Sequence, residues 1–184
     1  VHALESFTMS KPAFYLLSAG LLTVAVAGPA RAHVTLETTT APADGTYKAV
    51  LRVPHGCEGK STTALRVKIP EGVIAAKPMP KPGWQLATTT GKYAKGYDYY
   101  GTPVSEGVTE IAWTGGDLPD AWYDEFVFRA RLTGLPVDSV VYFPVVQECA
   151  DGAVDRWIEI PEPGKSPDDY ESPAPGVKIV PGGG

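Results

Sequence analysis

Apolar and polar residues alternate most regularly in one stretch, Glu125-Phe126-Val127-Phe128-Arg129-Ala130-Arg131-Leu132. The even-numbered residues are apolar and share one face of an extended chain, whereas the two arginines share the other. A period of two residues is typical of a β-strand with one buried face. The stretch therefore predicts a strand that covers an apolar core.

The same period recurs between residues 33 and 160. In residues 47–53 the odd positions are apolar and Lys48 and Arg52 point the other way, and residues 65–69 repeat the pattern. Turn-forming pairs such as Asp44-Gly45 and Asp151-Gly152 separate the segments. The further predicted strands are residues 33–38, 84–90, 93–100, 108–113, 140–146 and 154–160. About eight short strands with regular turns predict an all-β, antiparallel β-sandwich.

The composition is that of a single domain whose ends need not fold. The chain has 184 residues, of which 43% are hydrophobic, with 20 glycines and 18 prolines. Proline removes a backbone donor and fixes φ, so this content argues against long helices. The net charge is −5 and the sequence contains no run of Lys and Arg, which excludes nucleic acid as an expected partner. Residues 33–160 are predicted to form the sandwich, and the Pro- and Gly-rich residues 161–184 a disordered tail.

The first 32 residues have the pattern of a secretory signal peptide. Lys11 precedes an apolar run, residues 13–28, and Ala30-Arg31-Ala32 follows as an A-x-A cleavage site. The run is shorter than the roughly 20 residues that a membrane span requires, so a membrane anchor is the weaker interpretation. Residues 1–8 are interpreted as an upstream extension. We expect cleavage after Ala32, export to the periplasm or the cell exterior, and a mature chain without a membrane span.

Cys57 and Cys149 are the only two cysteines. An even number of cysteines in an exported chain predicts a disulfide bond. The alternative, a metal site with two thiolates, is weaker because exported thiols tend to oxidise. The bond would close a loop of about 90 residues. By lowering the entropy of the unfolded chain, it would stabilise the fold by about 4–5 kcal/mol.

Cleavage after Ala32 would give His33 two metal-binding nitrogens, its free α-amine and its ring Nδ1. Two neutral nitrogens in one chelate ring, with a carboxylate or water beside them, suit the tetragonal N,O geometry of Cu(II). The metal must displace protons from these groups, so binding weakens in acid. The alternative is that a histidine follows the cleavage site by chance.

A second group of candidate residues lies in the segment His55-Gly56-Cys57-Glu58-Gly59. If Cys57 joins Cys149, this loop is held near the turn that leads to Trp157. An imidazole, a carboxylate and an indole could then meet at one end of the sandwich. Each residue has an ordinary alternative role, as a solvated surface group for His55 and Glu58 and as a core residue for Trp157.

The order of several motifs resembles the YcnI-like copper-binding domain family. The matching segments are His33-Val34-Thr35, Val53-Pro54-His55-Gly56-Cys57-Glu58 with Thr62-Thr63, Val67-Lys68-Ile69-Pro70-Glu71-Gly72-Val73, Pro82-Gly83-Trp84, and Asp151-Gly152 with Trp157. The resemblance covers residues 33–160 and implies an immunoglobulin-like β-sandwich that binds Cu(II) through a mono-histidine brace. It implies His33 as the bidentate ligand, Glu58 as a carboxylate ligand and Trp157 as an aromatic neighbour. His55 is kept as a further candidate ligand.

The resemblance leads to the hypothesis of a copper chaperone or buffer outside the cytoplasm, which is not an enzyme and holds one Cu(II) per mature chain. Its expected partners are the copper ion and copper-importing or copper-delivery proteins at the membrane. One alternative is an oxidative copper enzyme similar to lytic polysaccharide monooxygenases, in which His55 would supply the second imidazole. Another is an exported immunoglobulin-like interaction module without metal.

Overall fold

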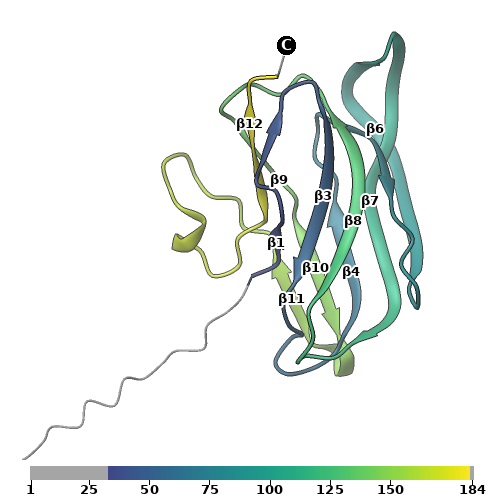
Figure 1. Ribbon diagram of the computed structural model, residues 1–184, viewed down its shortest axis with the longest axis vertical. Helices are drawn as coiled ribbons and strands as arrows, with labels where there is room; N and C mark the ends of the chain where they lie inside the picture. Colours follow the sequence, from purple (N-terminus) through teal and green to yellow (C-terminus); the bar gives the residue numbers. More distant parts are fainter. Residues whose placement is uncertain (1–32, 183–184) are drawn as a thin grey trace, which may run out of the picture. The chain divides into compact units, whose positions relative to one another are not determined.

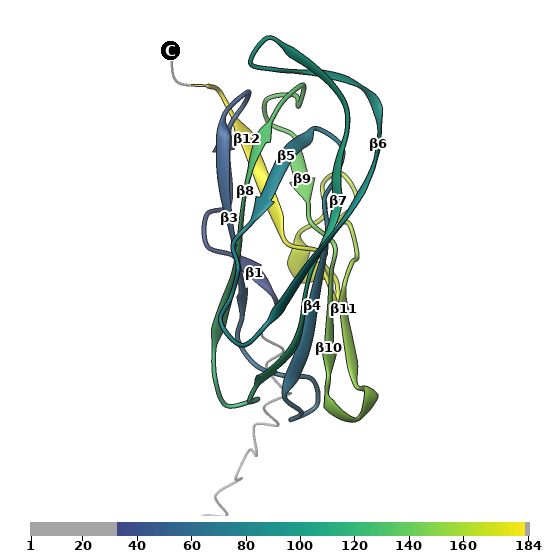
Figure 2. The ribbon, with the colours of Figure 1, turned by 90° about the vertical axis from the view of Figure 1, so that its right-hand side faces the viewer.

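Two β-sheets face each other and enclose the core in the computed structural model, which describes residues 33–182 (Figures 1 and 2). The predicted signal peptide lies outside the described residues. The four-stranded sheet has the order β1 (Thr35–Leu36), β3 (Thr46–Val53), β8 (Asp124–Leu132) and β5 (Val73–Pro78). The five-stranded sheet has the order β11 (Val154–Trp157), β10 (Val145–Cys149), β4 (Thr62–Lys68), β7 (Thr102–Leu118) and β6 (Gln85–Tyr99). Neighbouring strands within both sheets are antiparallel, as predicted.

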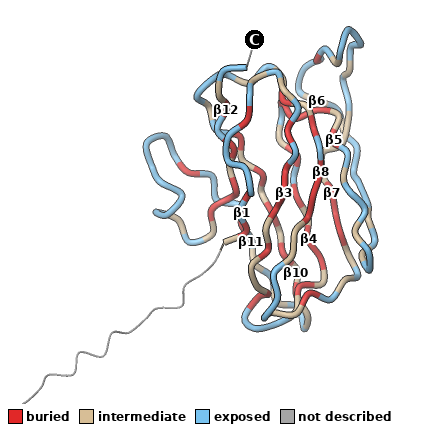
Figure 3. Tube along the Cα trace, viewed as in Figure 1, coloured by how far each residue is buried: buried red, intermediate tan, exposed pale blue. Residues whose placement is uncertain are grey.

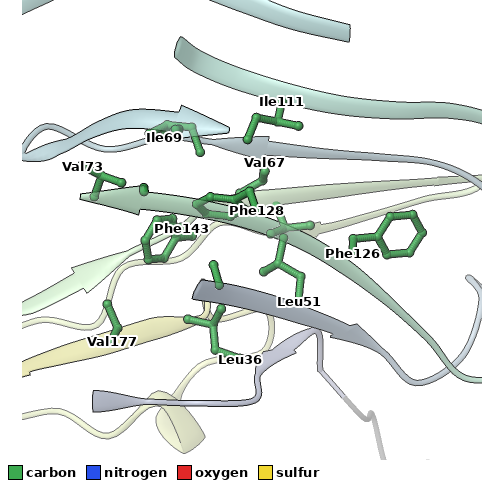
Figure 4. Packing of buried hydrophobic residues seen from close by; sticks show 14 of the residues in the cluster. Leu36, Leu51, Val67, Ile69, Val73, Ile111, Phe126, Phe128, Phe143 and Val177 are labelled. Atoms are coloured by element: carbon green, nitrogen blue, oxygen red, sulfur yellow. The ribbon is translucent and has the colours of Figure 1, made fainter. Parts of the chain in front are cut away.

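The core lies between the inward faces of the two sheets (Figure 4). Strand β8 buries Phe126, Phe128, Ala130 and Leu132, the four residues that the alternation placed inward. Strand β3, its partner, buries all four odd positions from 47 to 53. The opposite sheet contributes apolar side chains such as Leu65, Val67, Ile111, Trp113 and Val145. The predicted all-β, antiparallel β-sandwich is therefore confirmed.

For two groups of strands, the observed bounds differ from the predicted ones. Residues 84–90 and 93–100 belong to one strand, β6, because register shifts after Thr89 and after Lys92 let its pairing with β7 continue. The predicted strand 140–146 is divided into β9 (Val140–Tyr142) and β10, with Pro144 between them. Proline has no backbone N–H for a ladder, and the chain changes sheets at this point: β9 pairs with β12 (Gly176–Val180), whereas β10 pairs with β4.

The prediction of a disordered tail over residues 161–184 is wrong for its second half. Residues Gly176–Val180 form β12, which pairs in parallel with β2 (Thr40–Pro42) and antiparallel with β9 in a third, three-stranded sheet. Val177 and Ile179 of β12 are fully buried, so the core continues into this segment (Figure 3). The segment does contain a short strand pattern, in which Lys178 separates two apolar residues, but its many prolines favoured the prediction of disorder.

Helical structure in residues 33–182 is limited to two single 3₁₀ turns, η1 (Ala150–Gly152) and η2 (Pro167–Asp169). Within this part of the chain, therefore, no helix has the length and apolar character needed to span a bilayer.

Replacing Ile179 with alanine tests whether β12 belongs to the folded core. Ile179→Ala removes a fully buried side chain and leaves a cavity, so we expect the free energy of unfolding to fall by about 2–5 kcal/mol. Denaturant unfolding measures the change. Val137→Ala is the matched control, because Val137 is 45% exposed and outside any strand. Equal unfolding midpoints for the two variants would show that β12 contributes nothing to the core.

Candidate metal centre

The ring of His33 lies against the indole of Trp157. Their ring centroids are 5.3 Å apart and their planes are inclined by 51°. His33 precedes β1 and is partly exposed, whereas Trp157 ends β11 and is only 2% exposed. Because β1 is an edge strand of the four-stranded sheet and β11 an edge strand of the five-stranded sheet, this ring contact links the two sheets. Two of the predicted site residues are thus neighbours.

A buried amide holds Trp157 in its orientation. The indole N–H of Trp157 donates to Oε1 of Gln147 at 3.2 Å. The Nε2 group of Gln147 donates to the His55 carbonyl at 2.7 Å and to the Thr62 hydroxyl at 2.8 Å. Gln147 and Thr62 are the buried polar residues of the described chain, and these bonds satisfy both ends of the amide. Sequence reasoning missed Gln147, since a lone glutamine in an alternating strand gives no signal.

The predicted disulfide between Cys57 and Cys149 is confirmed, with Cα atoms 5.9 Å apart. It joins the loop after β3 to the end of β10, and the Cys57 N–H donates to the Cys149 sulfur at 3.0 Å. An ion pair between Lys60 and Asp151, at 2.8 Å, links the same two loops, and the ammonium group lowers the pKa of the Asp151 carboxyl through their hydrogen bond. The segment that carries His55 and Glu58 is therefore fixed at its base.

His55 faces its own loop. Its ring Nδ1 hydrogen-bonds to the Gly56 carbonyl, and its backbone carbonyl accepts the bond from Gln147. The described residues show no contact between the rings of His55 and His33. The structure brings the backbone of His55, rather than its imidazole, into the network that orients Trp157.

Glu58 is exposed at the tip of a tight turn. The backbone groups of Cys57 and Lys60 bond each other at 2.8 and 3.1 Å, and Glu58 and Gly59 between them both have positive φ. This is the backbone of a two-residue hairpin turn, in which a non-glycine residue at the first position is accepted at some cost. No hydrogen bond or ion pair links the Glu58 carboxylate to His33 or to any other described residue.

A pocket of about 220 Å³ opens beside His33. Its walls include Val34 and Thr35 on one side and Pro167, Asp168 and Pro173 on the other. The segment after β11 forms the second wall, and its turn η2 is closed by a capping box between Ser166 and Asp169. Asp168 and His33 both line this pocket. Asp168 was not predicted as a site residue, because its segment was predicted to be disordered.

These residues define what chemistry is available. In residues 33–182 no three His, Cys, Asp or Glu side chains converge as they would in a metal site built from side chains alone. A site at His33 therefore needs the backbone nitrogen of that residue as well as its ring. With a nearby carboxylate, the donor set would be two nitrogens and one oxygen, which suits Cu(II).

Residues 33–179 match a family described as a domain of unknown function, DUF1775. The chain belongs to the DUF1775 family. This is the family to which YcnI-like proteins are assigned, so the resemblance seen in the sequence is confirmed at the level of the family. The matched region begins at His33, the first residue of the predicted mature chain.

A crystal structure of an uncharacterized Nocardia farcinica protein, reported to have an immunoglobulin-like fold, is similar to this DUF1775 chain. The two share 27% identity with a TM-score of 0.59, over 80% of this chain and 98% of the other. The predicted immunoglobulin-like fold is thereby confirmed. No protein of curated function matches the chain significantly.

Replacing Gln147 tests the network behind the indole. Gln147→Leu leaves the Trp157 N–H and the His55 carbonyl without partners in a buried place, and we expect it to cost roughly 2–4 kcal/mol of stability. Thr62→Val is the control, because it removes one hydroxyl and keeps the bond to Trp157. Denaturant unfolding should rank the two variants in this order. A Gln147→Leu variant as stable as the parent would contradict the network.

Proposed function

We propose that the mature chain carries Cu(II) outside the cytoplasm, bound by the α-amine and ring of His33. The observation that supports this most directly is the contact of the His33 ring with the buried indole of Trp157. The start of the family match at His33 and the A-x-A sequence just before it support a free amine at this residue. The disulfide supports an oxidising compartment.

Copper is the cargo in this proposal, so the protein must hold it and release it. One histidine supplies two nitrogens in a single chelate ring, and the remaining positions are left to a carboxylate, water or the ligand of a receiving protein. Because the site sits at a partly exposed residue beside an open pocket, a partner can reach the metal. Copper-importing or copper-delivery proteins at the membrane are the partners that this arrangement suits.

Trp157 favours a carrier over a catalyst. An indole face near a cation attracts it by about 0.5–2 kcal/mol and excludes water from that side. The hydrogen bond to Gln147 restrains the indole plane, so the indole would stay in place on one side of the bound metal. A covered metal face reduces access for oxygen and for reductants. The ring of His55, bonded to its own loop, is not part of the proposed ligand set, and no second imidazole is required.

Two carboxylates can complete the site. The family resemblance assigns the role to Glu58, which stands exposed on the turn after β3. The pocket beside His33 contains Asp168 instead, on the segment after β11. We propose Asp168 as the stronger ligand, because it lines the same pocket as His33, and Glu58 as the alternative.

The amino-terminal brace is tested with two proteins that differ by one residue. The chain that begins at His33 should bind one Cu(II), with two nitrogen ligands in its electron paramagnetic resonance spectrum. A chain that begins at Ala32 has no free amine on His33, and we expect its affinity to fall by more than roughly 100-fold, since even outer residues of metal sites contribute 10- to 100-fold. Affinity of the His33 form should also fall from neutral to acidic pH because protons compete for both nitrogens.

The His55→Ala variant of the His33 form is the matched control and should bind copper as the parent does. Equal affinities for the two starting residues would refute the brace. Three nitrogen ligands that fall to two in His55→Ala would instead support the two-histidine site of an oxidative enzyme. If neither chain binds copper, the proposal is refuted and the metal-free interaction module is the function that remains.

The choice of carboxylate is tested by neutral substitutions. We expect Asp168→Asn to weaken Cu(II) binding by roughly 10- to 100-fold and Glu58→Gln to leave it nearly unchanged. Both substitutions remove one negative charge from an exposed residue, so each controls for the effect of net charge on the other. Competitive titration with a chelator measures the affinities. The reverse ranking would assign the oxygen ligand to Glu58.

A further inference from the structure

Three basic side chains stand in a row across the four-stranded sheet. In the observed register, Arg129 on β8 lies directly opposite Lys48 on β3 and also opposite Lys77 on β5. These strands are adjacent, with β8 in the middle (Figure 2). Residues directly opposite each other share a face, about 5 Å apart, and all three side chains are exposed on the outer side. We call these three residues the basic row.

Like charges placed opposite each other destabilise a sheet, and none of the three cations has a carboxylate partner among the described residues. Five other cations of the described residues do form ion pairs with a carboxylate, namely Arg52, Lys60, Arg66, Lys81 and Lys178. Arg52, farther along the same face, meets Glu125 at 3.6 Å, and Lys68 on the other sheet stands opposite Glu110. In a chain with net charge −5, an uncompensated row at one place requires an explanation.

A second feature adjoins the row. Arg131, two residues after Arg129, stacks its guanidinium on Tyr100 at 4.5 Å from the ring centroid. Its Nε is buried and has no hydrogen-bond acceptor. A small hollow lies here, lined by both arginines, Thr46 and the tyrosines of the β6–β7 turn. Tyr100 is 65% exposed, so the patch combines unpaired cations with an exposed aromatic ring.

We propose that this outer face docks on an anionic phospholipid surface, with the basic row, Arg131 and Tyr100 in contact with the headgroups. Three strands place the cations over about 10 Å, which is wider than a single phosphate and suits a plane of headgroups. Guanidinium groups pair with phosphate through two N–H donors, and tyrosine is favoured where an apolar region meets a wet one. This inference does not depend on copper binding, since it uses none of the residues of the metal centre.

Vesicle sedimentation with the chain from His33 onward, which contains the whole described fold, tests the proposal. The protein should bind vesicles of phosphatidylcholine mixed with phosphatidylglycerol and not vesicles of phosphatidylcholine alone, and salt should weaken the binding. Each cation near an anionic membrane contributes about fivefold, so the triple variant Lys48→Gln, Lys77→Gln, Arg129→Gln should bind roughly 100-fold more weakly. Its melting temperature should not fall, because the substitutions remove repulsion.

The matched control carries Lys60→Gln, Lys68→Gln and Lys178→Gln, which change the net charge equally but remove cations that face an acid. It should bind vesicles nearly as the parent does. Equal loss in both triple variants would reduce the effect to net charge and overturn the proposal. Lack of binding to the anionic vesicles would also overturn it. If inorganic phosphate abolishes vesicle binding completely, the patch is a site for a free anion. If the protein binds polyglutamate more strongly than vesicles, the patch is a site for an acidic protein, and either result overturns the proposal.

Discussion

A shift of one residue in the pairing of β3 with β8 would turn every side chain of the shifted strand to the opposite face. Phe126 and Phe128 would enter water, and Arg129 and Arg131 would enter the core. Burial of the aromatic pair therefore fixes the register, and the register in turn fixes which charges meet on the outside. Arg52 and Glu125 are opposite each other for the same reason that Lys48 and Arg129 are. Core packing and surface electrostatics have one cause in this sheet.

The candidate metal centre depends on hydrogen bonds that start from the five-stranded sheet. Gln147, fully enclosed on β10, bonds the loop after β3 through the His55 carbonyl, β4 through Thr62 and β11 through Trp157. The disulfide holds the first of these segments against the end of β10. An amide with both ends bonded in a low-dielectric interior leaves the indole little freedom to rotate. Within residues 33–182, the pairing of the short strand β1 and the contact with this indole hold His33 in place.

Local alternation was sufficient to predict the inward faces of β3 and β8, and the cysteine count was sufficient for the disulfide. For residues 161–184, the Pro- and Gly-rich composition led to the wrong prediction of a disordered tail. Two apolar residues are enough for β12, because β2 and β9 supply its backbone hydrogen-bond partners and its side chains enter an existing core. Gln147, Asp168 and the basic row could not be predicted, since each depends on which strands are neighbours. A sequence without a run of lysines and arginines can still assemble one across three strands.

The position of His33 separates the proposed metal site from the stability of the fold. Structural metal sites draw ligands from several elements, so the free energy of metal binding is also free energy of folding. Here both nitrogens would come from the first residue, ahead of β1, while the core is closed by the apolar faces, by β12 and by the disulfide without any contribution from His33. A carrier of the proposed kind would benefit from this arrangement, because its empty and loaded forms would share one folded core. In the proposed site, the buried Trp157, held by its bond to Gln147, would belong to the permanent structure, whereas the partly exposed His33 would exchange the metal.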